Sequence, residues 1–377
     1  MKKLENKIIS YIQGNGPITF DKFMEFALYD KEDGYYCKSG KRFGKSGDFY
    51  TSPTVHRAFG NVISKFIVRV FEAIDEQFVS VIEPGCGNGY LAVDILDCLK
   101  EFYPTVYENI HYYCIDKSIS NLDNAYELLA DHRAIVNFAA DISDLKDKHS
   151  GVVISNELFD ALPFHRIKFK DNKPYEIYIE NEGESFTEHL GKLSSNDLQK
   201  FIDNLNIHFE QDQQIEINLN YKKVIEQISN SLNKGVVVTF DYGWLSGELY
   251  SPERLDGTYR CFHNHQISAD PYINIGKQDI TSSVNFSDLI KLGEQNELKL
   301  IKYSTQGQFM VDWGVLDIIE KLDEKGRSTA KNLFMPGTMG DMFKVLIQQK
   351  NMNDSFTEHY PESILKISYQ STKDTIR

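Results

Sequence analysis

Residues 82–90 read IEPGCGNGY and follow the apolar run FVSV at positions 78–81. That run predicts a buried strand, and LAVDILDCLKEF at 91–102 has the apolar spacing of a helix with one buried face. A strand that ends in Gly85, Gly87 and Gly89 and opens into a helix is typical of a nucleotide-type site. Glycine permits the tight turn and lets backbone N–H groups approach a ligand. The alternative is a tight strand-to-helix connection without a ligand.

The residues around this turn narrow the kind of ligand. The dinucleotide fingerprint needs glycine or alanine at position 90, where this chain has Tyr90, and the Gly-Lys-Ser/Thr ending of a phosphate-binding loop is absent. Glu83, at the carboxyl end of the strand, would repel a pyrophosphate and attract a cation. S-adenosylmethionine carries a sulfonium and an ammonium group, and it therefore fits.

Two later strand ends offer further cofactor contacts. Asp116 ends the next predicted strand, where an acidic side chain can bind ribose hydroxyls; alternatively, it caps the helix that begins near KSISN. Asp141 and Ile142 follow the third strand and suit the adenine edge and face. The residues expected to bind S-adenosylmethionine are therefore Glu83, Gly85, Gly87, Gly89, Asp116, Asp141 and Ile142.

Strand-like apolar runs recur between segments of helical periodicity, which predicts an α/β fold with a mostly parallel sheet covered by helices on both sides. Two connections, 158–234 and 244–297, are too long for simple crossovers and hold additional β and helical patterns. We expect an N-terminal helical segment and active-site cover at 1–60, a main domain at 61–350, and a polar tail at 351–377. The two insertions should form a substrate-side subdomain. The predicted strands are 78–83, 110–116, 134–139, 151–156, 235–243, 298–304 and 342–349.

The composition of the chain argues against some classes of binding partner. The 377 residues carry a formal net charge of −14, which argues against a protein that binds the phosphate backbone of nucleic acid. The sequence contains no run of about 18 apolar residues, so we expect no membrane span. The first residues match neither a secretory signal nor a mitochondrial import sequence, so we expect a cytoplasmic protein. Oligomeric state cannot be inferred.

Eight motifs in order resemble the MidA family of S-adenosylmethionine-dependent methyltransferases: GPITFDKFMEFALYDKEDGYY, GDFYTSPTVHRAFG, EPGCGNGYLAVDIL, ISNELFDALPFHRI, TFDYG, GTYRCFHNH, IGKQDITSSVNFSDL and MGDMFKVL. The resemblance implies a class I methyltransferase (Rossmann-like) fold with a seven-stranded sheet whose last strand is antiparallel. It implies cofactor contacts at the three glycines, Asp116 and Asp141, and an active-site cover that contains GDFYTSP. The family includes a mitochondrial complex I assembly factor described as a protein arginine methyltransferase, so a protein substrate, such as a subunit of a respiratory complex, is implied.

Candidate catalytic residues follow the fourth and fifth strands, because ligands of open α/β sheets bind at the carboxyl ends of strands. Glu157 is placed to bind and deprotonate a nitrogen acceptor, with Asn156 as a hydrogen-bonding partner and Asp160 further along. Asp241, in TFDYG, adds a carboxylate at the same edge. The alternative is that Ser155 and Asn156 cap a short helix and that Glu157 lies in its first turn.

A second set of residues should cover the substrate. Arg260, His265 and Asp279, with Thr281, are interpreted as a lid network, or else as purely structural residues. Cys261, His263 and His265 alternate along an extended segment but lack a complete ligand set, so no metal is expected. The N-terminal segment should contribute Asp48, Phe49 and Thr51 to the pocket.

These observations favour a protein arginine N-methyltransferase. Two alternatives stay open: an S-adenosylmethionine-binding assembly factor whose main role is to hold a partner, and a methyltransferase that acts on a small molecule.

Overall fold

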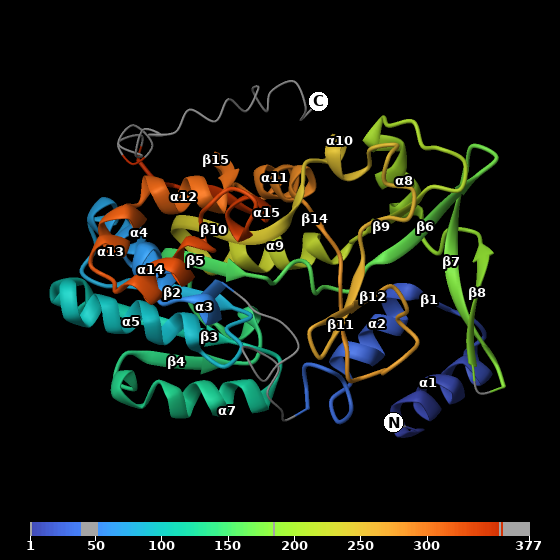
Figure 1. Ribbon diagram of the computed structural model, residues 1–377, viewed down its shortest axis with the longest axis horizontal. Coiled ribbons are helices and arrows are strands. Elements are labelled where there is room, and N and C mark those ends of the chain that lie inside the picture. Colours follow the sequence, from blue (N-terminus) through green and yellow to red (C-terminus); the bar gives the residue numbers. More distant parts are fainter. Residues whose placement is uncertain (1, 39–51, 184, 354–355, 357–377) are drawn as a thin grey trace. The chain divides into compact units, whose positions relative to one another are not determined.

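A computed structural model describes residues 2–38, 52–183, 185–353 and 356, and the chain divides into two compact units (Figure 1). Unit 1 comprises Met1–Phe49, Phe159–Lys222 and Trp244–Asp288. Unit 2 comprises Tyr50–Leu158, Lys223–Gly243 and Leu289–Arg377. Each unit is therefore assembled from segments that are far apart in the sequence.

The sheet of unit 2 confirms the predicted α/β class. Seven strands follow one another in the order β15-β16-β10-β5-β2-β3-β4. Neighbours among β10, β5, β2, β3 and β4 pair in parallel, and β16 pairs antiparallel with both β10 and β15, as the resemblance implies. The two-residue strand β14 (Val284–Asn285) lies off this path and falls in the third segment of unit 1. The seven strands are β2 (Val79–Pro84), β3 (Ile110–Ile115), β4 (Val136–Ala139), β5 (His149–Asn156), β10 (Leu232–Trp244), β15 (Lys299–Thr305) and β16 (Phe343–Lys350).

Helices of unit 2 bury apolar faces in one core with these strands. α4 (Ala58–Ile74) packs on α5 (Tyr90–Phe102) and on β2 and β5, and its fully buried side chains include Phe59 and Phe66. α5 and α6 (Pro104–Glu108) connect β2 to β3, and α7 (Ile119–Leu128) and the 3-10 turn η1 (Ala130–His132) connect β3 to β4. The remaining helices are α3 (Ser52–Val55), α9 (Asn220–Ser231), α11 (Phe286–Gln295), α12 (Gln306–Asp312), α13 (Val315–Glu320), α14 (Glu324–Lys331) and α15 (Met339–Met342).

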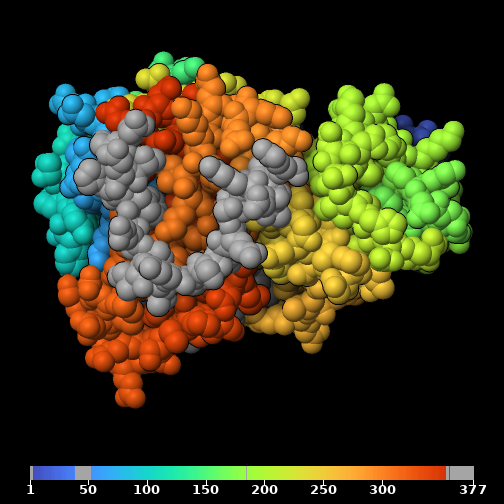
Figure 2. Space-filling model, turned by 90° about the horizontal axis from the view of Figure 1, so that it is seen from above, coloured from blue at the N-terminus to red at the C-terminus, as the bar shows by residue number. Residues whose placement is uncertain are grey.

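Unit 1 is built on a second, antiparallel sheet. Its order is β1-β7-β6-β9, with β8 paired to β7. The bounds are β1 (Ile18–Thr19), β6 (His165–Lys170), β7 (Lys173–Glu182), β8 (Ser185–Gly191) and β9 (Gln214–Ile217). The light-green atoms on the right of Figure 2 belong to this part of unit 1, which also includes α8 (Asn196–Leu205).

A third, three-stranded sheet and the N-terminal helices complete unit 1. The sheet has the order β12-β11-β13, with β11 (Arg260–His263), β12 (Gln266–Ser268) and β13 (Asp279–Thr281). The helices α1 (Lys2–Asn15) and α2 (Phe20–Tyr29) share an apolar core with β1, β7, β11 and β13. The short α10 is Ser246–Leu249. No helix among the described residues is both long and apolar enough to span a membrane.

Candidate functional site

The glycine turn lies where β2 ends and α5 begins. Gly85, Gly87 and Gly89 all adopt positive φ, at 74°, 53° and 81°. The backbone N–H groups of Gly85 and Cys86 donate to the Ile115 carbonyl at 2.7 and 3.1 Å, so the turn is anchored to the end of β3. This conformation is open to glycine at little cost and strained for other residues.

Packing is a second reason for glycine at two of these positions. A Cβ on Gly89 would lie 3.0 Å from the Ala125 Cβ, and a Cβ on Gly85 would lie 3.1 Å from Leu158 Cδ1. The turn therefore requires glycine at 85 and 89 for its own geometry, independently of a ligand. The contact with Leu158 also shows that the segment after β5 packs against the turn.

Asp116, at the end of β3, is hydrogen-bonded to the same turn. Its Oδ2 accepts from the Gly87 N–H at 3.0 Å, and its Oδ1 accepts from the Ser118 N–H at 2.8 Å and from the Asn121 amide at 3.2 Å. The N-cap of α7 is Ser118, whose side chain accepts from the Asn121 N–H. Asp116 thus holds the glycine turn and the start of α7 together, and its contact with ribose stays a prediction.

Asp141 and Ile142 lie at the end of β4, as expected. Asp141 is the N-cap of the short helix η2 (Ile142–Asp144), and its Oδ1 accepts from Ser143 and from the Gln227 amide at 2.7 Å. Burial alone would raise the pKa of this carboxyl, but the hydrogen bonds from Ser143 lower it overall. Ile142 is buried. An adenine contact stays a prediction for both residues.

Glu83 is the buried acid of the site, with 3% of its surface exposed. The Tyr112 hydroxyl donates to its Oε2 at 2.7 Å. Burial raises the pKa of the carboxyl from 4.5 to about 8, an effect that the Tyr112 hydrogen bond opposes and Asp116 reinforces. Near neutral pH the group is therefore mostly protonated unless a cation lies beside it. Sequence analysis missed Tyr112, although it lies on β3 two residues before Cys114, the partner of Glu83 in the sheet.

Glu83→Gln should flatten the pH dependence of stability between about pH 4.5 and 8. In this window the unfolded chain ionises Glu83 while the folded chain keeps it protonated, so the unfolded state binds fewer protons. The stability that Glu83 contributes is fully present below about pH 4.5. It is lost as the pH rises from there to about 8, by up to about 1.4 kcal/mol per pH unit. Urea unfolding of both proteins at several pH values measures this, and a pH-independent difference would contradict it.

Asn156 and Glu157 end β5 beside β10. The Glu157 N–H donates to the Phe240 carbonyl at 2.9 Å, and the Asn156 amide donates to Glu157 Oε1 at 3.0 Å. Residues 157–162 form a turn and no helix begins there, so the helix-cap alternative is wrong. Glu157 instead adopts φ of 52°, an unfavourable conformation for a residue with a Cβ. Such strain is frequent at functional sites.

The two other predicted catalytic carboxylates, Asp241 and Asp160, belong to different units. Asp241 lies in β10 of unit 2, fully buried, and directly follows Phe240, which pairs with Asn156. Asp160 belongs to unit 1, where it is buried and its carbonyl accepts from the Ser282 N–H at 3.1 Å. Their catalytic roles stay predictions.

Three of the predicted lid residues come together in unit 1. Arg260 in β11 pairs with Thr281 in β13, and Asp279 lies on the same strand as Thr281. His265 lies in the exposed turn between β11 and β12. Asp48, Phe49 and Thr51 lie outside the described residues.

Tyr36 is a residue of this region that sequence analysis missed. Its hydroxyl donates to Asp279 Oδ1 at 2.7 Å, and the two residues are 243 positions apart, so no local pattern could connect them. Burial, and next the charge of Asp279, raise the pKa of Tyr36 well above its ordinary value. The tyrosine therefore stays protonated, and its hydroxyl donates a hydrogen bond to the buried carboxylate.

Comparison with known proteins identifies the family. Residues 62–304 match the model of a family described as "Putative S-adenosyl-L-methionine-dependent methyltransferase". Among relatives, the "Protein arginine methyltransferase NDUFAF7 homolog, mitochondrial" of Drosophila melanogaster is 24% identical, over 96% of this chain and 87% of its own length. The corresponding mouse protein is 24% identical, over 92% and 81%.

A solved structure confirms the fold. The chain superposes with a TM-score of 0.85 on a protein from Burkholderia thailandensis, crystallised with S-adenosyl-homocysteine, with 93% of each chain covered and 23% identity. The predicted class I methyltransferase fold is therefore confirmed.

One prediction is contradicted by the relatives. The prediction of a cytoplasmic protein is wrong by this comparison, since the Drosophila, mouse and human relatives are named as mitochondrial proteins. The composition of the first residues is therefore no guide to the compartment.

Proposed function

Because the chain belongs to the family of S-adenosylmethionine-dependent methyltransferases that its residues 62–304 match, we propose that it methylates an arginine side chain of a protein. The observation that carries the proposal is the strained conformation of Glu157, with φ of 52°, at the sheet edge that also holds the glycine turn. The relatives named as protein arginine methyltransferases support the choice of acceptor.

The cofactor supplies an electrophilic methyl group on a positively charged sulfur. We assign Glu83 to its cationic end and Asp116 to its ribose hydroxyls, with the 85–89 turn beside it. Asp141 and Ile142 are assigned to the adenine. Acidic side chains at the ends of β2, β3 and β4 suit a ligand with positive charge and no phosphate, and this chemistry supports the assignment.

Glu157 is proposed to bind the acceptor and take its proton. A guanidinium has a pKa above about 12, so the site must hold a cation and accept its proton as the new N–C bond forms. The 3.0 Å hydrogen bond from Asn156 orients the Glu157 carboxylate. Asp241, one residue beyond the pairing partner of Asn156, adds a second negative charge on the neighbouring strand.

We propose that unit 1 recognises the substrate. Its pieces include most of the insertions 158–234 and 244–297, and its buried acids Asp160 and Asp279 suit a positively charged side chain. Arg260 and His265 are proposed to contact the substrate protein from the same unit, and Asp48, Phe49 and Thr51 from the N-terminal segment. The family resemblance suggests a subunit of a respiratory complex as the partner.

Methyl transfer can be tested directly. The purified chain is incubated with isotopically labelled S-adenosylmethionine and an extract, and the label is then located among protein, lipid and small-molecule fractions. We expect label on protein, and a mass shift of one or more methyl groups on arginine in the digested peptides. Label confined to small molecules or lipid, or on residues other than arginine, would contradict the proposal.

A further inference from the structure

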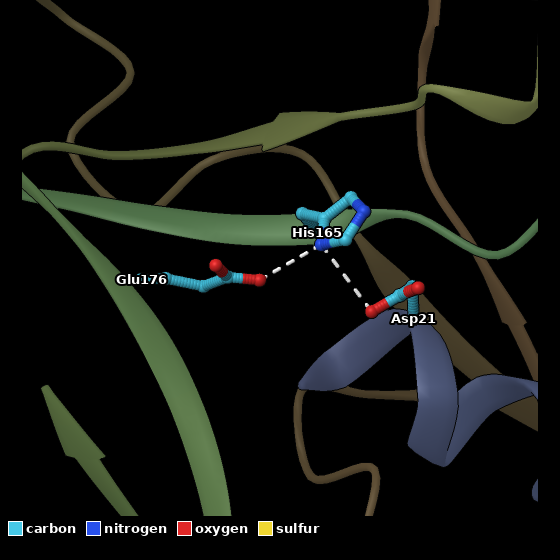
Figure 3. Close-up of side chains that lie close together, drawn as sticks. All are labelled: Asp21, His165 and Glu176. Carbon is cyan, nitrogen blue, oxygen red and sulfur yellow. Dashed lines mark hydrogen bonds and ion pairs between the residues drawn. The ribbon is translucent and has the colours of Figure 1, made fainter. Parts of the chain in front are cut away.

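Three side chains of the type that bind metals converge in unit 1. Asp21 lies in the first turn of α2, His165 begins β6 and Glu176 lies in β7. Figure 3 shows the three side chains pointing toward one another, and their donor atoms all lie within 4.8 Å. His165 Nδ1 is 2.8 Å from Glu176 Oε1 and 3.3 Å from Asp21 Oδ1. None of them belongs to the Cys261–His265 motif.

Because these side chains are largely buried, two acids and one imidazole cannot fully satisfy one another's charges and hydrogen bonds. The exposed fraction of the side chain is 0% for Glu176, 11% for His165 and 27% for Asp21. His165 Nδ1 can carry only one proton, and its closer partner is Glu176. Asp21 Oδ1 is buried and accepts no hydrogen bond from any residue that the structure describes. A buried carboxylate oxygen that accepts no hydrogen bond is unfavourable, and a cation between the three groups would satisfy it.

Neighbouring groups fix the orientation of the donors. The Ser194 N–H donates to Glu176 Oε2 at 2.6 Å, which leaves Oε1 directed at His165. The second ring nitrogen of His165 points away from both carboxylates (Figure 3). Two carboxylates therefore face one ring nitrogen at this point of unit 1.

We propose that Asp21, His165 and Glu176 bind a divalent transition-metal ion, with zinc as the best fit, which joins α2 to β6 and β7. Zinc accepts imidazole nitrogen and carboxylate oxygen at about 2.0–2.2 Å in tetrahedral geometry, which separates donors by about 3.3–3.5 Å. The Asp21–His165 separation of 3.3 Å already has this value. The His165–Glu176 separation must open by about half an ångström from a hydrogen-bonding distance.

Charge and protonation also fit this ion. One divalent cation balances two carboxylates, and the neutral imidazole presents its Nδ1 lone pair to the metal while its other nitrogen keeps a proton. The proton in the hydrogen bond between His165 Nδ1 and Glu176 must leave that nitrogen when the metal binds. Water completes the fourth position. The site is independent of methyl transfer, because it uses none of the residues assigned to that reaction.

The test uses the untagged full-length chain after treatment with a chelator. Calorimetric titration with zinc chloride should show one saturable site, and zinc should raise the thermal unfolding midpoint. Asp21→Asn, which keeps the shape of a partly exposed side chain, should weaken zinc binding by about tenfold or more, because loss of a ligand costs at least as much as loss of an outer-shell partner. His165→Gln should do the same and provides a second, independent variant.

Glu180→Gln is the matched control. Glu180 lies on β7 as Glu176 does, and its Oε2 is 3.5 Å from His189 Nδ1, but the two side chains are 49% and 41% exposed and no third donor joins them among the described residues. We expect zinc affinity close to that of the unaltered chain. The proposal is overturned if the chain binds no zinc, or if Asp21→Asn and His165→Gln bind it as tightly as Glu180→Gln does. The cluster would then be a hydrogen-bonded ion pair.

Discussion

Glu157→Gln should lower the rate of methyl transfer by about 10²–10⁴-fold, the usual contribution of a positioned general base. Glutamine keeps the size of the side chain and can still hydrogen-bond to Asn156, but it cannot accept the proton that the acceptor nitrogen loses. Affinity for S-adenosylmethionine should change little, because the cofactor is assigned to other residues. Initial rates with a saturating labelled donor, together with calorimetry, separate the two quantities.

Asp75→Asn is the control for this variant. Asp75 is also an acid with positive φ in unit 2, at 56°, but it is the C-cap residue of α4 and is exposed. It should leave both rate and affinity unchanged. Full activity in Glu157→Gln would exclude Glu157 as the proton acceptor. Unchanged maturation of a partner despite lost methylation would instead favour a binding role for the chain.

Gly89→Ala should weaken S-adenosylmethionine binding by about tenfold or more. The added Cβ meets the Ala125 Cβ at 3.0 Å in a backbone conformation with φ of 81°. Strain of about 1–2 kcal/mol at such an angle, added to this contact, should displace the turn and with it the Gly87 N–H that Asp116 holds. Calorimetry measures the affinity, and thermal unfolding measures how much stability is lost.

Gly183→Ala reproduces the backbone strain alone. Gly183 has φ of 67°, and a Cβ there would meet no atom within 4 Å. This variant should lose some stability and keep the full affinity for S-adenosylmethionine. If Gly89→Ala loses stability to a similar degree and still binds the cofactor normally, the turn is only a tight connection between β2 and α5.

Sequence patterns predicted the central sheet well because its inner strands β2, β5 and β10 contain short, mostly apolar runs between helices. β2, α5 and β3 begin and end within two residues of the predicted bounds, and β16 is antiparallel as expected. Such runs are typical of strands buried on both faces, and the periodicity of the intervening helices is local. The fold class therefore required no knowledge of long-range contacts.

The joining of the N-terminal helices to the two insertions in unit 1 could not be predicted by the same reasoning. β1 consists of only two residues, and Ile18 pairs with Ile179 across the antiparallel sheet of unit 1. This pairing depends on tertiary contacts between segments that carry no shared pattern. The hydrogen bond between Tyr36 and Asp279 and the ion pair between Asp21 and His165 could not be predicted for the same reason, because each joins residues that are far apart in the sequence.

At the site, the sequence predicted the strand ends correctly but did not predict the backbone conformations of the residues that follow them. Ser155, Asn156 and Glu157 suit a helix cap as well as a strained turn, since both use short polar side chains followed by an acid. The turn at 157–162 and the positive φ of Glu157 decide between them. The raised pKa of Glu83 likewise depends on burial, which the hydrogen bond from Tyr112 on another strand opposes.

Calorimetric titration of the unaltered chain with S-adenosylmethionine and, separately, with NAD tests the central claim most directly. We expect one saturable site for S-adenosylmethionine and no heat with NAD, because Tyr90 and Glu83 disfavour a dinucleotide at this turn. Tight binding of NAD without a response to S-adenosylmethionine would contradict the assignment of the turn and, with it, the proposed reaction.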